Sequence, residues 1–101
     1  MTNSSSVHHD AAQGRFELTV DGHSCELLYA LTPNLPGQPG LMRIHHTEVP
    51  PALGGRGLAA LLADAALAHA RAQGLRVQPS CSYVRLYMQR HPETLDLLPQ
   101  P

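Results

Sequence analysis

Short apolar stretches alternate with turns rich in glycine and proline along the first half of the chain, and this pattern predicts β-strands. In residues 15–20 the apolar side chains occupy every second position, which is the period of a half-buried strand. Residues 25–31 and 41–49 are predicted as two further strands. Residues 21–24 (DGHS) favour a turn, so the first two strands are expected to form an antiparallel hairpin. Residues 32–40, with three prolines and two glycines, favour a loop.

The second half of the chain changes to a helical period. In residues 56–73 the apolar positions follow three-four spacing and alanine fills most of the rest, which predicts the longest helix. Gly74 is suited to end it, because glycine takes a left-handed conformation without a Cβ penalty. Residues 75–81 are predicted as a fourth strand. Residues 82–91 are predicted as a second helix that ends before Pro92, and Ser80 or Ser82 is its expected N-cap.

This order, β-β-β-α-β-α, predicts a minimal α/β fold. A strand–helix–strand unit favours a right-handed crossover and a parallel strand pair, so a mixed β-sheet with an N-terminal antiparallel hairpin and a β-α-β-α C-terminal half is expected. Residues 1–13 are polar and are predicted to be disordered. Residues 14–101 are predicted to form a single domain.

Composition narrows the classes of partner and reaction. The net charge of the 101 residues is close to zero (-1), so neither nucleic acid nor a membrane is expected as a partner. The start of the chain resembles no secretory leader, which favours a cytoplasmic protein. All seven basic residues are arginines, and this excludes a Schiff base on a lysine side chain. The spacing of Cys25, Cys81 and the histidines predicts no metal site.

A run of glycines stands directly before the long predicted helix. Gly54, Gly55 and Gly57 surround Arg56 at the point where the first helical N–H groups lack intrahelical acceptors. Such a loop can bring backbone amides close to a phosphate, and the helix dipole adds positive charge there. The known nucleotide motifs with lysine or G-x-G-x-x-G are absent from the sequence. A tight strand-to-helix turn without a ligand is the alternative interpretation.

The wider context identifies a family. The segment TEVPPALGGRGLAALL (residues 47–62) resembles the acyl-CoA-binding segment of GNAT-type N-acetyltransferases, in which R/Q-x-x-G-x-G/A opens a helix. Gly54 departs from the Arg or Gln of that pattern. An H-T-E-V motif from His46 to Val49 and a C-x-Y-x3-Y-x4-P motif that begins at Cys81 also resemble a small single-domain subfamily. The resemblance covers residues 15–98.

The resemblance implies that acetyl-CoA is the co-substrate. It places pantetheine between the third and fourth strands, paired with the backbone of Val49. The residues that it implies for the pyrophosphate are Gly54, Gly55, Arg56, Gly57, Leu58 and Ala59.

Five side chains are candidates for the chemistry. In a regular strand Ile44, His46 and Glu48 share one face, so Glu48 with His46 as its partner is a candidate base. A polar sheet face exposed to solvent is an equally consistent interpretation, and a β-bulge would change which side chains share the face. Cys81 near the start of the last helix is a candidate nucleophile or a small buried hydrophobe. Cys25 is interpreted as structural.

Tyr83 and Tyr87 lie one helical turn apart. The resemblance implies that a tyrosine of this helix protonates the departing thiolate, and packing in the core is the alternative.

Two functions remain open from the sequence: an N-acetyltransferase that acts on an unidentified amine or protein, and a non-enzymatic module that binds or senses CoA or acyl-CoA. The two helices that GNAT enzymes place early in the fold have no room between Val20 and Leu27. The acceptor cleft is therefore expected to be open or to be completed by a partner. The chain itself is expected to be a monomer or a homodimer.

Overall fold

The structure is a computed structural model that describes residues 7–33 and 35–99. Its centre is a five-stranded sheet in the order β1-β2-β3-β4-β5. Neighbouring strands are antiparallel except for β4 and β5, which are parallel. The strands are β1 (His8–Asp10), β2 (Arg15–Val20), β3 (His23–Thr32), β4 (Leu41–Glu48) and β5 (Arg76–Pro79). The predicted mixed α/β fold is confirmed.

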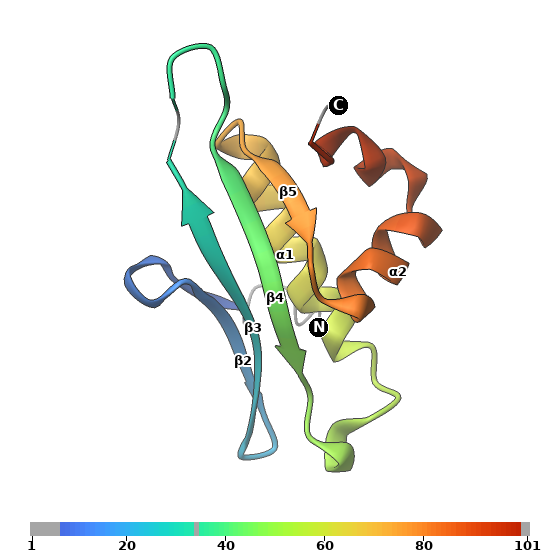
Figure 1. The fold of residues 1–101 in the computed structure, drawn as a ribbon. Coiled ribbons are helices and arrows are strands. Elements are labelled where there is room, and N and C mark those ends of the chain that lie inside the picture. Colours follow the sequence, from blue (N-terminus) through green and yellow to red (C-terminus); the bar gives the residue numbers. More distant parts are fainter. Residues whose placement is uncertain (1–6, 34, 100–101) are drawn as a thin grey trace.

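Two helices complete the domain (Figure 1). Helix α1 (Leu58–Ala72) connects β4 to β5 and lies behind the sheet in this view, and α2 (Ser82–Arg90) follows β5. Short 3-10 turns cover residues 11–13, 51–53 and 92–97. The predicted N-caps Ser80 and Ser82 are wrong: Cys81 is the N-cap of α2, and no side chain caps this helix.

The prediction that residues 1–13 are disordered is wrong for residues 8–13. The polar strand β1 pairs with β2, with His9 opposite Phe16. The His9 ring stacks on the Phe16 ring at 4.1 Å between centroids, so a histidine supplies the apolar contact that the sequence pattern lacks. Residues 1–6 of the same prediction lie outside the described residues.

The core lies between one face of the sheet and the helices. Helix α1 buries a face rich in alanine, including Ala63, Ala66 and Ala70, which are fully buried. Because alanine side chains are short, the helix can approach the sheet closely. The buried residues of the sheet are Phe16, Leu18, Cys25, Leu27, Tyr29, Met42, Ile44 and Val77.

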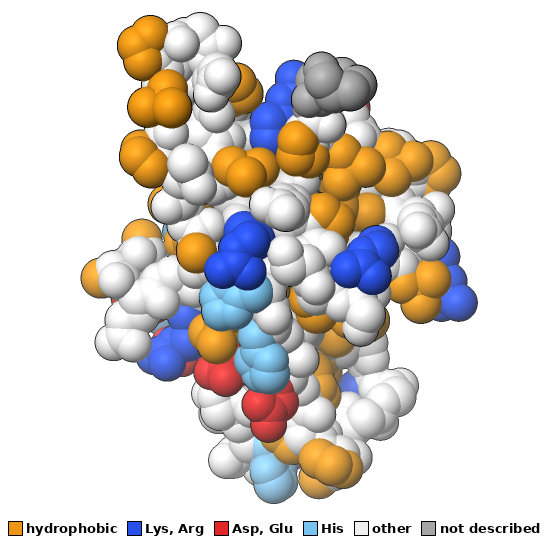
Figure 2. Space-filling view, in the orientation of Figure 1, with side chains coloured by type: hydrophobic (Ala, Val, Ile, Leu, Met, Phe, Trp, Pro, Cys, Tyr) orange, Lys and Arg blue, Asp and Glu red, His pale blue; other side chains and the backbone are white. Residues whose placement is uncertain are grey.

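No helix of the described residues covers the opposite face of the sheet (Figure 1). Figure 2 shows arginine, histidine and acidic side chains gathered over the middle of this face. No helix of the described residues is long and apolar enough to cross a membrane.

A β-bulge in β4 determines which side chains reach the uncovered face. Leu28 pairs with His46, but the next residue, Tyr29, pairs with Ile44, so His45 is the extra residue. Ile44 therefore points into the core, whereas His46 is exposed. The expectation for a regular strand, that Ile44 shares a face with His46 and Glu48, is wrong because of this bulge.

Candidate functional site

Strands β4 and β5 separate halfway along β4. Their parallel pairing begins at Leu41 with Arg76 and ends at Ile44 with Pro79. The Cys81 amide then donates to the Ile44 carbonyl at 3.0 Å, and the chain turns into α2. Within the part of the chain that the structure describes, residues 45–48 of β4 have no pairing with β5. This segment presents a free backbone edge beside the start of α2.

The glycine loop follows this free edge after residues 49–53, which include a 3-10 turn. Gly55 and Gly57 have φ angles of 81° and 74°, in the left-handed region that favours glycine. A Cβ atom at either position would meet nothing within 4 Å, so the space in front of the loop is open. Gly57 is the N-cap of α1 and offers no side chain to the first-turn amides. The loop therefore exposes backbone amides at the positive end of a 15-residue helix.

A pocket of about 250 Å³ lies at this loop. It is lined by six of the seven residues predicted to bind the cofactor, namely Val49, Gly54, Gly55, Gly57, Leu58 and Ala59. Tyr83 of α2 also lines it, together with Leu53 and Ala60. The end of β4, the loop, the start of α1 and the first turn of α2 thus meet at one concave surface.

Arg56 is the predicted residue that lies apart from this pocket. Its guanidinium donates to the Asp21 carboxylate at 2.8 Å, in an exposed ion pair with the turn between β2 and β3. Asp21 itself has a positive φ of 51°. Arg56 thus connects the glycine loop to the hairpin and does not point along the pocket lining.

Cys81 is half-buried at the N-cap of α2, and its Sγ atom lies 3.5 Å from Thr47 Oγ1. Burial by itself raises the pKa of the thiol. The contacts with the Thr47 hydroxyl and with the backbone amides of Val84 and Tyr83, together with the charge of Arg85, lower it further than burial raises it. The net result is a lowered pKa, which favours the thiolate. Thr47 was not predicted to take part, because its contact with Cys81 joins residues that are 34 positions apart.

The two tyrosines of α2 face different spaces. Tyr83 lines the pocket at the glycine loop, whereas Tyr87 lines a second pocket of about 360 Å³ between α1 and residues 93–97. The Tyr87 ring stacks on His91 at 4.1 Å between centroids. Burial raises the pKa of both phenols, so both stay protonated at neutral pH.

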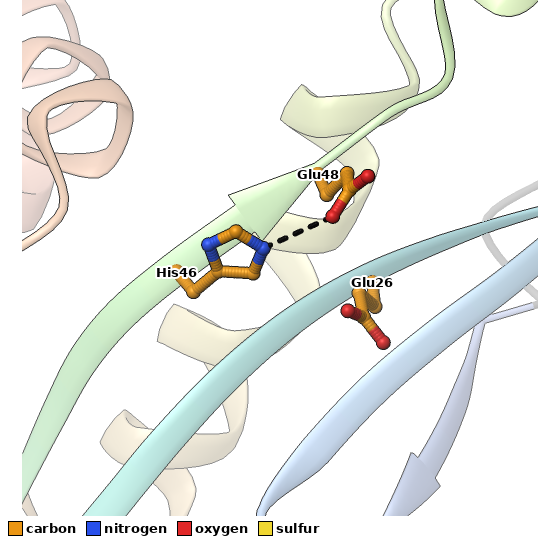
Figure 3. Close-up of side chains that lie close together, drawn as sticks. All are labelled: Glu26, His46 and Glu48. Carbon is orange, nitrogen blue, oxygen red and sulfur yellow. Dashed lines mark hydrogen bonds and ion pairs between the residues drawn. The ribbon is translucent and has the colours of Figure 1, made fainter.

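His46 and Glu48 lie on the uncovered face. His46 Nε2 is 3.2 Å from Glu48 Oε1, and both side chains are exposed. Glu26 of β3 lies beside them, as Figure 3 shows. Thr47 lies between them in sequence and points to the opposite face, toward Cys81. The predicted base and the predicted nucleophile therefore lie on opposite faces of β4.

Comparisons with known proteins agree with this geometry. The family model described as GCN5-related N-acetyl-transferase matches residues 15–97. Protein NATD1 of Mus musculus is 33% identical over 86 residues, which cover 85% of this chain and 76% of the mouse protein. Protein NATD1 of Homo sapiens is also 33% identical over 86 residues, which cover 85% of this chain and 74% of the human protein.

Solved structures share the fold. A GCN5-like protein from Staphylococcus aureus superposes with a TM-score of 0.69 at 23% identity, covering 100% of this chain and 93% of that one. A ribosomal-protein-alanine N-acetyltransferase from Brucella melitensis biovar Abortus 2308 gives a TM-score of 0.57 at 18% identity, with coverage of 75% and 59%.

Proposed function

The chain belongs to the GCN5-related N-acetyltransferase family, and from this premise we propose that it binds acetyl-CoA and transfers the acetyl group to an amine. One observation carries the proposal: the free edge of β4 ends at Val49 beside a pocket that the glycine loop, the start of α1 and Tyr83 line. An extended thioester with an anionic end group fits that combination.

The pyrophosphate is assigned to the glycine loop. The first turn of α1 has no side-chain cap, and the space where a Cβ at Gly55 or Gly57 would lie is open. An anion there accepts hydrogen bonds from the amides of the loop and of this turn and interacts favourably with the helix dipole. Arg56 is held by Asp21, so backbone amides are the main donors in this proposal.

The pantetheine arm is assigned to the free edge of β4. Beyond Ile44 the strand has backbone groups on the side that β5 has left. An amide-containing chain can pair with them as a short added strand, and Val49 lies where this edge meets the pocket. The thioester would then lie near Cys81 and Tyr83.

In direct transfer, the amine nitrogen attacks the thioester carbonyl carbon and the carbon–sulfur bond breaks. Glu48, oriented by the hydrogen bond with His46, is the proposed final acceptor of the proton that the amine loses. Because Glu48 lies on the opposite face of β4 from Cys81 and Tyr83, the proton reaches it through water at the free edge of the strand. Tyr83 gives its phenolic proton to the departing thiolate, and its raised pKa keeps that proton available at neutral pH.

In the alternative route Cys81 acts as a nucleophile. Its thiolate attacks the same carbonyl carbon, and the departing CoA thiolate takes the proton of Tyr83. The amine then attacks the carbonyl carbon of acetyl-Cys81, the carbon–sulfur bond breaks to release the Cys81 thiolate, and the proton lost by the amine returns to Tyr83 through water. The lowered pKa of the Cys81 thiol supports this route.

A non-enzymatic acyl-CoA-binding module is the second candidate function. The observation that favours it is the placement of the His46–Glu48 pair and the Cys81–Thr47 contact on opposite faces of β4. Such a module needs the glycine loop and Val49 but none of the proton-transfer residues.

Calorimetric titration with acetyl-CoA, followed by intact-mass measurement, tests the proposal. Binding with turnover across a panel of amines supports the transferase, and binding without turnover or adduct supports the module. An acetyl adduct that is lost in Cys81→Ser and kept in Cys25→Ser supports the covalent route. Absence of binding at about 1 mM acetyl-CoA, where even a weak site would be half occupied, contradicts both functions.

A further inference from the structure

Three potential metal ligands converge on the uncovered face of the sheet. Glu26 of β3 and His46 and Glu48 of β4 each offer one ligand atom, and these atoms lie within 4.8 Å of one another (Figure 3). We propose that they bind one divalent first-row transition-metal ion, with Zn²⁺ as the probe, at a site separate from the glycine loop.

The distances suit such an ion. Bonds of about 2.0–2.2 Å at tetrahedral angles place two ligand atoms of one Zn²⁺ about 3.3–3.6 Å apart. His46 Nε2 and Glu48 Oε1 are already 3.2 Å apart. The exposed side chain of Glu48 and the half-buried side chain of Glu26 can close the remaining distance by rotation. One imidazole and two carboxylates leave a position for water.

The sheet itself sets this arrangement. Glu26 pairs with Glu48 in the β3–β4 register, which places the two side chains next to each other on one face. The bulge at His45 turns His46 to that same face, as described above. Without the bulge, the alternation of β4 that holds for Ile44 would direct position 46 into the core.

The charges on this face are compatible with a bound cation. Glu17 pairs with Glu26, and Glu26 pairs with Glu48, so three carboxylates lie in a row across β2, β3 and β4. Like charges directly opposite each other are destabilising. Arg15 compensates Glu17 at 3.3 Å, but among the described residues no arginine forms an ion pair with Glu26 or Glu48. A bound dication would supply the missing positive charge.

The donor set selects the class of ion. Imidazole with carboxylates suits Zn²⁺ and its first-row neighbours, whereas Mg²⁺ and Ca²⁺ prefer oxygen ligands alone. A metal here also uses the lone pairs of Glu48 and His46. If Glu48 is the base in the proposed transferase, the ion would inhibit acetyl transfer, and this consequence alone rests on the proposed function.

The test is calorimetric titration of the full chain with Zn²⁺ near neutral pH, in parallel with the variants Glu26→Gln and His46→Gln. We expect one ion per chain and a loss of affinity of about tenfold or more in each variant. The matched control is His45→Gln, since His45 is the neighbouring exposed histidine outside the cluster, and it should keep the affinity of the unchanged protein.

Zinc also binds thiols, so the titration is repeated with Cys81→Ser. Unchanged affinity, together with a metal-dependent shift of the His46 ring nitrogen in ¹⁵N NMR, supports the site. Binding that is lost in Cys81→Ser but kept in His46→Gln and Glu26→Gln overturns it, as does absence of binding at about 1 mM Zn²⁺. Acetyl-CoA titrations of the same samples distinguish the metal site from the proposed acetyltransferase function. If the protein binds acetyl-CoA but not Zn²⁺, only the metal site is overturned.

Discussion

Replacement of Gly55 by alanine tests whether the glycine loop binds the pyrophosphate of acetyl-CoA. At this position the effect of backbone strain on stability can be separated from the effect on ligand binding. Gly55 has a φ of 81°, and an added Cβ would meet no atom of the protein within 4 Å. The cost to the free protein is therefore backbone strain, about 1–2 kcal/mol for a non-glycine residue in the left-handed region. For a domain of this size each kcal/mol lowers Tm by about 4–8 °C.

The effect on binding is expected to be larger than strain alone explains. The new Cβ would occupy the open space that is assigned to the pyrophosphate and would displace an anion from a backbone amide. Loss of one hydrogen bond to a charged group costs about 1.5–3 kcal/mol, which corresponds to roughly a 10- to 150-fold weaker Kd for acetyl-CoA. Calorimetric titration measures this change, and thermal unfolding measures the strain.

Gly37→Ala is the matched control. Gly37 has a φ of 79° and likewise has no atom within 4 Å of an added Cβ, but it lies in the loop between β3 and β4, away from the pocket. The two variants should lose similar stability, and Gly55→Ala alone should lose affinity for acetyl-CoA. Equal affinity of both variants would refute the assignment of the pyrophosphate to the glycine loop.

Three further results are expected. Tyr83→Phe should lower kcat by about 10²–10⁴-fold with little change in acetyl-CoA affinity. Tyr87→Phe, which alters the other pocket, should leave kcat unchanged. Equal effects of the two variants on kcat in steady-state assays would contradict the role of Tyr83 as the acid. Thr47→Val should raise the pKa of the Cys81 thiol, measured as the pH dependence of its alkylation, and an unchanged profile would show that the Thr47 contact does not stabilise the thiolate. Burial and the nearby His69 lower the pKa of His9 below its usual 6.5, so the unfolded chain binds more protons as the pH falls through 6.5. The free energy of unfolding should therefore be fully maintained above pH 6.5 and decrease below it, and urea titrations of His9→Phe should lack this part of the decrease.

The sequence pattern was sufficient to predict those helices, strands and loops whose formation depends on residues close together in the chain. Alternating apolar positions, the alanine-rich helical stretch and the glycine run predicted β2 to β5, α1 and the loop correctly, to within a few residues. The resemblance to the GNAT family supplied the order of the site residues, and the family model and the shared fold confirm that membership.

Contacts between residues far apart in the sequence could not be predicted from the sequence pattern. Strand β1 depends on the stacking of His9 on Phe16, and the sequence pattern of residues 1–13 gives no sign of it. The bulge at His45 leaves no mark in the alternation of β4, yet it decides that His46 faces away from Ile44. The separation of Tyr83 from Tyr87 requires knowledge of what packs against each side of α2, and the same is true of the ion pair of Arg56 with Asp21.

The central claim is that the glycine loop and the free edge of β4 form an acyl-CoA site. A titration of the ¹⁵N-labelled protein with acetyl-CoA, followed in ¹H–¹⁵N NMR spectra, tests it residue by residue. The largest shifts are expected at the amides of Val49, Gly55, Gly57 and Leu58, with small changes at Gly37 and Gly74, which lie outside the pocket. Saturable binding whose shifts avoid the loop, or spectra unchanged at about 1 mM acetyl-CoA, would contradict the account.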